Sequence, residues 1–360
     1  MTLGRLVSEL RRRGNEIDVI RPAVLACSEP GMEVPSVGLP GYPEVRVGFP
    51  MRLVLQARWS REPPDIIYVA TETPLGTSAI NAARALGIPV VSGFHTNFQQ
   101  YVAHYQLPLL ERAALRYLRH VHNRTNCTFA PSPDVIAELR RQGFAHVELL
   151  SRGVDTEQFS PERRDPLLRL EWGASGRAPV GIYVGRIAAE KNLPLVIRTF
   201  NELTRRFPDF RGVIVGDGPK LSELKTNYPN FIYAGPRYGE DLGRHYASAD
   251  IFVFPSTTET FGNVTLEAMA SGLAVVAYDY AAARQHLVAE KNGFPVQLED
   301  EDAFVEAAVF ATQHPRRAKI RQQARRSARK MRWKKVALRF EKHLEQLVEA
   351  ESPNLSPSMT

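Results

Sequence analysis

The stretch PSTTETFGNVTLEAMASGLAVVA, residues 255–277, follows the apolar run IFVF and carries Glu259 and Glu267 on either side of a glycine. Gly262 and Asn263 are typical of a turn and a helix cap, so we expect a helix to begin there and to hold Glu267 in its opening turns. Glu259 then lies in the loop beyond the strand. The free N–H groups of the helix start, at about residues 262–265, favour a phosphate between the two acids.

This order of acid, phosphate seat and acid suits a ligand with a hydroxyl-rich ring on each side of a diphosphate, because carboxylates accept hydrogen bonds from sugar hydroxyls. A nucleotide sugar has that shape. The segment YVGRIAAEKN places Arg186 and Lys191 at another strand-to-helix connection, where they could neutralise the diphosphate and stabilise it as a leaving group. Alone, each fragment is weak, since such residues are usually surface charges. Their order after successive strands is what makes the combination informative.

Short apolar runs alternate with helix-like stretches along the rest of the chain. The runs are EIDVIRP, DIIYVA, IPVVSGFH, CTFAPS and VELLSRG in the first half, and PVGIYVGR, FRGVIVGDGP, NFIYAGP, ADIFVFPS and LAVVAYD in the second. Strands that are apolar throughout and joined by helices predict parallel sheets covered on both faces. The pattern therefore predicts an α/β protein of two doubly wound domains with a ligand site in the cleft between them.

The expected domain limits follow from where this alternation is interrupted, near residues 153–178. We expect an acceptor-side domain over residues 1–152 and a donor-binding domain over 153–320. A basic helix over 321–350 is expected to pack back toward the first domain, and 351–360 is expected to be a disordered tail. The length of 360 residues is consistent with two domains.

The composition, with 44% hydrophobic residues and mixed charge, is that of a globular protein. Cys27 and Cys127 lack the spacing of a metal or redox site, so neither a metal centre nor a disulfide scaffold is expected. No run reaches the ~18 apolar residues of a membrane span, and the opening MTLGRLVSELRRRGNE is too polar for a secretory leader. We therefore expect a cytoplasmic protein.

The formal charge of +7 is concentrated in residues 316–342, which carry thirteen Lys or Arg against the single acid Glu341. Three interpretations stay open: a solvated face of a surface helix, a face that rests on anionic lipid head groups, and a nucleic-acid site. The last is the weakest, because no aromatic platform or recognition module accompanies the charge. If the lipid interpretation holds, the cations expected to face the membrane include Arg325, Arg326, Arg329 and Lys330.

The segments VGRIAAEKNL, VIVGDGP and ETFGNVTLEAMASGLAVVA resemble the donor-domain signatures of the retaining nucleotide-sugar glycosyltransferases of the GT-B fold, family four. The last of these is similar to the family's E-x7-E motif, and SRGVDTEQFSP resembles the segment that enters the donor domain. GFHTNFQQYVAHY is similar to the branch that contains GDP-mannose-dependent α-mannosyltransferases and sulfoquinovosyl-diacylglycerol synthases. The resemblance covers nearly the whole chain and implies two Rossmann-like domains.

The resemblance also implies a role for each matching residue. Glu259 would hold donor-sugar hydroxyls and Glu267 the ribose hydroxyls, while His95 would face the donor sugar from the opposite domain. A lone histidine after a strand is more often buried with a satisfied ring, but its position in GFHTNF favours the site. The expected catalytic residues are His95, Glu259, Arg186 and Lys191, and the expected donor-binding residues are Gly185, Arg186, Lys191, Gly216, Gly218, Glu259, Phe261, Gly262, Asn263, Val264 and Glu267.

The reaction implied by the resemblance is transfer of a hexose, of mannose or glucose type, from a GDP- or UDP-sugar to a lipid or lipid-linked glycan. The configuration at the anomeric carbon would be retained, with the departing phosphate oxygen taking the proton of the incoming hydroxyl. No protein nucleophile, bound cofactor or metal is then expected, and catalysis reduces to positioning and charge stabilisation. The partners would be the donor, the acceptor and an anionic membrane surface at the inner face of the membrane, and not nucleic acid.

One feature departs from the family. Members usually begin with a β-strand and a glycine-containing loop, whereas this chain begins inside the helix that follows, at MTLGRLVSELRRRGNEIDV. We expect either a start upstream of Met1 or a first domain without one of its central strands. Three alternatives remain: a sugar-nucleotide epimerase or phosphorylase of the same fold, a truncated nucleotide-sugar binder without activity, and a nucleic-acid-binding protein.

Overall fold

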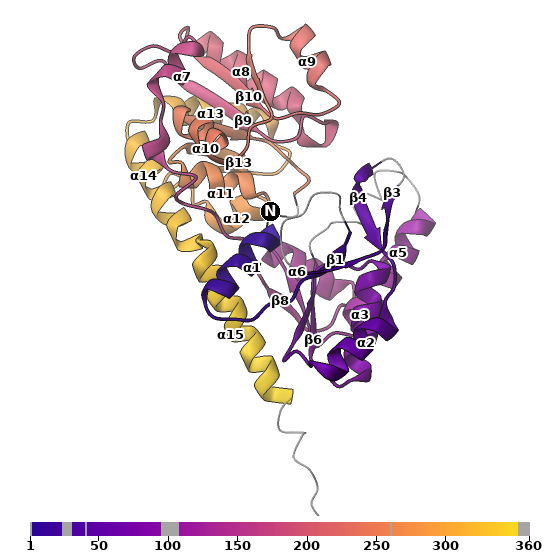
Figure 1. Cartoon of the computed structure of the whole chain (residues 1–360). Helices are drawn as coiled ribbons and strands as arrows, with labels where there is room; N and C mark the ends of the chain where they lie inside the picture. Colours follow the sequence, from indigo (N-terminus) through magenta and orange to yellow (C-terminus); the bar gives the residue numbers. More distant parts are fainter. Residues whose placement is uncertain (1, 24–30, 40–41, 95–107, 260, 352–360) are drawn as a thin grey trace, which may run out of the picture. The chain divides into compact units, whose positions relative to one another are not determined.

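The computed structural model in Figure 1 describes residues 2–23, 31–39, 42–94, 108–259 and 261–351. The chain forms two compact units. Unit 1 comprises Met1–Ser151 together with Val336–Thr360, and unit 2 comprises Arg152–Lys335. Each unit has its own parallel sheet and its own hydrophobic core.

Unit 2 is built on a six-stranded sheet in which every pair of neighbours is parallel. In spatial order β11-β10-β9-β12-β13-β14, the strands are Ile232–Gly235, Arg211–Val215, Val180–Val184, Ile251–Phe254, Ala274–Tyr278 and Phe294–Val296. The order runs outward in one direction from β9 and in the other from β12. Such a reversal is the switch point of a doubly wound sheet, and ligands bind beside it at the carboxyl ends of the strands.

Helices cover this sheet, and the central strands β9, β12 and β13 are buried along their whole length. Helix α8 buries Leu195, Phe200 and Leu203 against the core and packs with α13, while α11 packs with α14. The helical elements of unit 2 are η1 (Pro161–Arg163), α7 (Pro166–Glu171), η2 (Ala189–Lys191), α8 (Leu193–Arg206), α9 (Leu221–Asn227), α10 (Gly239–Ser248), α11 (Asn263–Ala270), α12 (Ala281–His286), α13 (Glu301–Gln313), α14 (Arg317–Ala328) and η3 (Arg329–Met331).

Unit 1 contains a smaller parallel sheet in the order β5-β6-β7-β8, formed by Ile67–Val69, Val90–Gly93, Cys127–Ala130 and Val147–Leu149. A parallel pair, β1 (Ile20–Pro22) and β2 (Met32–Val34), and an antiparallel pair, β3 (Ser36–Leu39) and β4 (Tyr42–Gly48), accompany it. The helices are α1 (Thr2–Arg12), α2 (Arg52–Arg61), α3 (Pro74–Ala85), α5 (Pro108–His122) and α6 (Pro133–Arg141), together with α15 (Trp333–Glu351) from Val336 onward.

The apolar runs predict ten of these strands, and the two-block α/β architecture is confirmed. They do not predict β2, β3, β4 and β14. Residues 31–48 mix glycines, prolines and single apolar residues, and β14 has the sequence FPV, so neither segment shows the unbroken apolar run of a buried parallel strand.

The prediction of one basic helix over 321–350 is wrong. Helix α14 ends at Ala328, and a 3-10 turn and an extended residue, Arg332, separate it from α15. The reason is a competing backbone pairing: the amide of Val154 donates to the carbonyl of Met331 at 2.8 Å, and Val154 and Arg332 form a parallel bridge. The backbone contacts of Val154 thus keep Met331 and Arg332 from continuing helix α14.

The last helix, α15, is anchored within unit 1 by aromatic packing and by a charged contact. Phe340 packs edge-on against Tyr68 at 5.3 Å and Phe129 at 5.0 Å. Glu341, the single acid of residues 316–342, lies 2.5 Å from a guanidinium nitrogen of Arg13. The predicted tail over 351–360 lies, apart from its first residue, outside the described residues.

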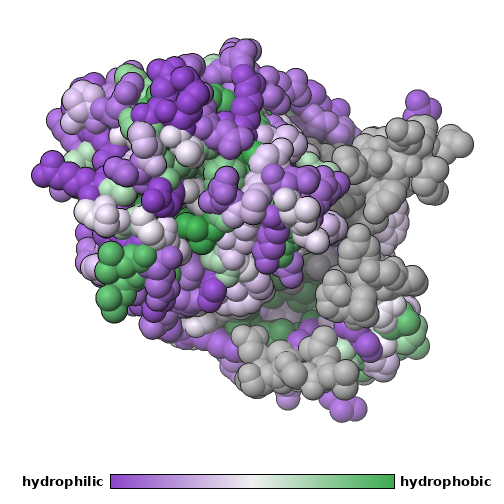
Figure 2. Space-filling view, turned by 90° about the horizontal axis from the view of Figure 1, so that it is seen from above, coloured by the Kyte–Doolittle hydropathy of each residue, from purple (hydrophilic) through white to green (hydrophobic). Residues whose placement is uncertain are grey.

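Across the ranges that the structure describes, no helix combines the length and apolar content needed to cross a bilayer. On the face shown in Figure 2, hydrophilic residues predominate and hydrophobic residues appear in small separate groups.

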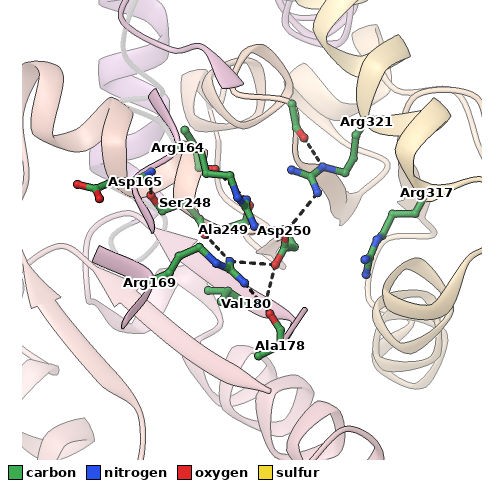
Figure 3. A network of polar contacts seen from close by, with 12 residues as sticks. Arg164, Asp165, Arg169, Ala178, Val180, Ser248, Ala249, Asp250, Arg317 and Arg321 are labelled. Atoms are coloured by element: carbon green, nitrogen blue, oxygen red, sulfur yellow. Dashed lines mark hydrogen bonds and ion pairs between the residues drawn. The ribbon is translucent and has the colours of Figure 1, made fainter. Parts of the chain in front are cut away.

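A buried carboxylate, Asp250, joins three segments of unit 2 at the amino end of β12 (Figure 3). It lies 3.0 Å from Arg164, 3.2 Å from Arg169 and 3.2 Å from Arg321, and it accepts the amide hydrogen of Val180 at 3.1 Å. Burial alone would raise the pKa of Asp250, but the three guanidinium groups lower it below its ordinary value. The arginines also donate to backbone carbonyls, so the network fixes η1, α7 and α14 to the sheet.

We expect Asp250→Asn to destabilise unit 2, because it leaves three partly buried arginines without their counter-charge. Breaking such a buried network costs about 3–5 kcal/mol, so the melting temperature should fall by about 6 °C or more. Thermal unfolding followed by circular dichroism measures this. The exposed carboxylate of Asp209 supplies the control, and a loss in Asp250→Asn no larger than in Asp209→Asn would contradict the expectation.

Candidate functional site

The candidate site lies where the loops after β9 and β12 meet at the switch point of unit 2. The two strands are paired through Gly181 with Ile251 and Ile182 with Phe252, so the residues that follow them leave the sheet side by side. The hydroxyl of Thr258 donates to the carbonyl of Glu190 at 3.0 Å and ties the loops together. The topology thus brings the segment GRIAAEKN next to STTET.

Lys191 and Glu259 form the centre of this site. The ammonium of Lys191 lies 2.5 Å from Oε1 of Glu259 and also donates to the carbonyl of Thr258 at 3.2 Å. The hydroxyl of Ser256 donates to the same carboxylate oxygen at 2.8 Å. Both charged side chains keep about one sixth of their surface exposed, 16% for Lys191 and 17% for Glu259. One carboxylate oxygen is therefore held by the protein while the group still reaches solvent.

The start of helix α11 lies beside this carboxylate. Gly262 caps the helix in the left-handed region with φ +83°, and Glu259 lies so close that its Cγ would be 3.5 Å from a Cβ at this position. No side chain caps the helix, and the buried Oδ1 of Asn263 has no hydrogen-bond partner within the described ranges. The first amides of a helix lack intrahelical partners, and together with the helix dipole they attract an anion.

Glu267 lies one turn further along α11, in a more enclosed place. The hydroxyl of Tyr246, a fully buried residue, donates to its Oε2 at 3.1 Å. Part of the Glu267 side chain remains accessible, yet burial of its carboxyl raises the pKa from 4.5 to about 7. The two acids of the quoted stretch therefore differ: Glu259 is paired with a cation, and Glu267 is held by a neutral donor.

Arg186 is expected to bind the diphosphate together with Lys191, at the same strand-to-helix connection. In the structure its side chain is half exposed, and its guanidinium lies 3.4 Å from the carboxylate of Glu190. Its backbone is fixed, because the buried hydroxyl of Tyr183 donates to the carbonyl of Arg186 at 2.9 Å. Burial, together with the nearby Glu259 and Glu190, raises the pKa of Tyr183, which keeps this donor protonated.

The glycines of the site are required by the chain's own packing. Gly216 has φ +141° and Gly218 φ +155°, and a Cβ on them would lie 1.9 Å from the carbonyl oxygen of Gly185 and 2.3 Å from that of Ile187. The amide of Ile187 also donates to the carbonyl of Asp217 at 2.8 Å. The backbones of the loops after β9 and β10 are therefore in direct contact. This contact alone requires glycine at both positions, whether or not a ligand binds there.

Of the remaining expected residues, His95 lies outside the described residues. Phe261 is buried and its ring contacts His286 at 6.0 Å, so the part of it that could meet a ligand is its backbone. Val264 is half-buried against the core. Four residues of the site were not expected from the sequence: Tyr183, Tyr246, Ser256 and Thr258. The last two lie inside the quoted stretch PSTTET, but nothing in their spacing distinguishes them from ordinary loop hydroxyls.

No group of three or more His, Cys, Asp or Glu side chains with metal-binding geometry occurs in the part of the chain that the structure describes.

Comparison with known proteins identifies the family of this chain. The family model for glycosyl transferases group 1 matches residues 178–314, and the model for glycosyltransferase family 4 matches residues 1–158. A GDP-mannose-dependent alpha-mannosyltransferase of Mycobacterium tuberculosis is 33% identical over 302 residues, which cover 80% of this chain and 77% of that protein. The chain belongs to the family-four glycosyltransferases.

Other relatives and solved structures are also similar to this glycosyltransferase. An alpha-monoglucosyldiacylglycerol synthase of Streptococcus pneumoniae is 31% identical over 228 residues, covering 59% of this chain and 52% of that protein. Among solved structures, sucrose-phosphate synthase from Thermosynechococcus elongatus matches with a TM-score of 0.74 at 18% identity. The match covers 97% of this chain and 93% of the synthase chain. HepE of Anabaena in complex with UDP and glucose has a TM-score of 0.67 at 19% identity, with coverages of 82% and 80%. The fold of the glycosyltransferase is GT-B.

The raised pKa of Glu267 predicts a pH-dependent stability for this glycosyltransferase. The folded chain holds the proton up to about pH 7 and the unfolded chain only to about 4.5, so ionisation destabilises the fold progressively across this interval and fully above it. Glu267→Gln cannot ionise and can still accept from Tyr246. Its melting temperature relative to the wild type should therefore rise between pH 5 and pH 8.

The matched control is Glu223→Gln, which removes an exposed carboxylate of α9. It should change little over the same pH range. An equal difference between Glu267→Gln and the wild type at pH 5 and pH 8 would contradict the expected raised pKa.

Proposed function

We propose that this glycosyltransferase moves a mannosyl group from GDP-mannose to a lipid or lipid-linked glycan with retention of the anomeric configuration. The GDP-mannose dependence of the mycobacterial relative supports the donor, and the diacylglycerol product of the pneumococcal relative supports the lipid acceptor. In this proposal unit 2 binds the donor.

The observation that carries the proposal is the contact of Lys191 with Glu259 beside the open start of α11. The helix start would receive the diphosphate, and Glu259 would accept hydrogen bonds from the sugar hydroxyls. Lys191, which contacts Glu259, would offset the charge that develops on the leaving phosphate. Glu267 would accept the ribose hydroxyls. Because donated hydrogen bonds favour the ionised carboxylate, donor binding would release its proton near neutral pH.

In the proposed step the bond from the anomeric carbon to the phosphate oxygen breaks, and a bond to the acceptor oxygen forms on the same face of the sugar. The proton of the acceptor hydroxyl passes to the departing phosphate oxygen. The protein then contributes orientation and charge stabilisation and needs no nucleophile of its own.

We expect Glu259→Gln to lower turnover by about 100-fold or more, the order found when one group that stabilises a transition state is removed. The substitution keeps the size of the side chain, so the fold should survive. Initial rates of transfer from labelled GDP-mannose, with the melting temperature of the same sample, measure both effects. Glu223→Gln serves again as the control. Full activity in Glu259→Gln would remove this carboxylate from the mechanism.

The proposed function itself is tested by incubating the full chain with labelled GDP-mannose or UDP-glucose, with and without lipid extract. A labelled product that partitions into organic solvent and keeps the α configuration supports the proposal. Release of a free epimer, or saturable binding without turnover, would replace it with the epimerase or the inactive binder.

We also propose that the exposed cations at the end of unit 2 attract an anionic membrane surface. Between residues 316 and 335, seven exposed Lys or Arg side chains take part in no ion pair within the described ranges: Lys319, Arg326, Arg329, Lys330, Arg332, Lys334 and Lys335. The expectation that Arg325 faces the lipid is wrong. Its guanidinium is largely buried and donates to the carbonyls of Phe159, Ala270 and Thr156. Removing it would test folding and not membrane binding.

Neutralising Lys319, Arg326 and Lys330 together, each to Gln, should weaken binding to vesicles that contain anionic lipid. Each cation near such a surface contributes about 1 kcal/mol, so the partition coefficient should fall by about 100-fold at low salt. Co-sedimentation with vesicles measures it. Replacing the dispersed, exposed residues Arg177, Lys225 and Lys291 by Gln makes the same change in net charge. Equal partitioning of the two triple variants would show that Lys319, Arg326 and Lys330 have no specific part in membrane binding.

A further inference from the structure

A chain of buried polar side chains in unit 1 ends in one carboxylate that reaches the surface. The hydroxyl of Ser92 lies 2.8 Å from Nδ1 of His122, and Nε2 of His122 lies 3.0 Å from Oε1 of Glu72. Thr125 and Thr128 surround the serine at 3.0 and 3.2 Å. Ser92 and His122 are 2% and 1% exposed, whereas the side chain of Glu72 is 19% exposed.

The burial decides which end of this chain can act. A serine, a histidine and a glutamate in contact resemble a hydrolytic triad, but a serine oxygen enclosed by two threonines and a histidine is closed to a substrate. The carboxylate can only accept, so Nε2 of His122 carries the hydrogen that it donates to Glu72. Nδ1 then accepts from Ser92 when the ring is neutral. The polar chain thus orients the imidazole, and the imidazole orients Glu72.

The backbone around Glu72 is held as firmly as its side chain. The hydroxyl of Tyr117 donates to the carbonyl of Glu72 at 2.9 Å, and Tyr117 and His122 both belong to α5. On the other side, Thr73 caps α3, and Gly76 approaches the carbonyl of Thr71 so closely that a Cβ would lie 2.0 Å from that oxygen. A loop residue fixed at backbone and side chain is preorganised for a ligand.

The position of Glu72 in the fold matches such a role. It follows the carboxyl end of β5, next to β6, which contains Ser92. Ligands of parallel α/β sheets bind at this edge. Its second carboxylate oxygen has no hydrogen-bond partner among the described residues. An anionic acceptor atom at this edge fits a ligand that brings hydroxyl donors.

We propose that Glu72 binds a hydroxyl of the acceptor substrate and that His122 is its positioning residue. This inference rests on the proposed function, in which the donor occupies unit 2 and the other substrate must supply a nucleophilic hydroxyl. Glu72 selects for an acceptor with a hydroxyl-rich head group, such as a glycolipid or a polyol, over a simple alcohol.

The sharpest variant is Glu72→Gln. The N–H of His122 keeps the amide oxygen as its partner, so the atom turned toward the ligand changes from a hydrogen-bond acceptor to an NH₂ donor. Loss of one hydrogen bond to a charged group should raise the KM for the acceptor by about 10-fold or more. The KM for GDP-mannose and the slow hydrolysis of GDP-mannose without acceptor should stay unchanged.

His122→Phe tests the positioning role. Phe94 and Phe144 pack against the His122 ring at 5.6 Å, so an aromatic replacement retains this packing and loses the hydrogen bond to Glu72. His122→Phe should also raise the KM for the acceptor. The double variant Glu72→Gln/His122→Phe should have an acceptor KM within about twofold of that of Glu72→Gln alone. Glu62→Gln and His120→Gln, exposed residues of the same types on α2's end and on α5, are the matched controls.

The experiment measures transfer from GDP-mannose to octyl α-mannopyranoside, hydrolysis without acceptor, and the melting temperature of every variant. A raised acceptor KM in Glu72→Gln and His122→Phe with unchanged donor KM supports the inference. A lower melting temperature with an unchanged acceptor KM overturns it and leaves Glu72 a structural residue. If the wild-type chain transfers mannose to no acceptor, the proposed function fails first and the inference falls with it.

Discussion

The ion pair between Lys191 and Glu259 is the interaction on which the candidate site depends. Its two partners come from loops 68 residues apart in sequence, and only the adjacency of β9 and β12 at the switch point brings them within 2.5 Å. The pair fixes one carboxylate oxygen through Lys191 and Ser256 and leaves the group beside the start of α11. Carboxylate, cation and helix start thereby share one small region, which suits a ligand that carries both hydroxyls and phosphates.

The two glutamates of the E-x7-E stretch have the same chemistry and different surroundings. Glu259 is held by an ammonium group and stays close to solvent, whereas Glu267 is enclosed and accepts from the neutral hydroxyl of Tyr246. The resulting rise in the pKa of Glu267 means that a ligand binding there competes with a proton and not with a lysine. The two acids on either side of one helix start therefore have different hydrogen-bonding partners.

The cationic side chains of residues 316–342 fall into a partly buried group and an exposed group. Arg321 points inward to Asp250 and the carbonyl of Gly272, and Arg325 donates to carbonyls before η1 and at the end of α11. Lys319, Arg326 and Lys330 remain exposed. In unit 1, a comparable use of buried polarity links Ser92 and His122 to the partly exposed Glu72. In unit 1 the buried network fixes the direction of a carboxylate that still reaches solvent.

The sequence by itself determined the α/β class, ten of the strands, the E-x7-E stretch and the family, because apolar runs, glycine turns and local motifs are properties of neighbouring residues. The tertiary structure decided which charges meet. It paired Arg186 with Glu190, turned Arg325 inward, broke the basic helix at Arg332 through Val154, and joined Glu72 to His122 across 50 residues. These outcomes depend on burial and on contacts between distant segments, and neither quantity is written in the spacing of residues along the chain.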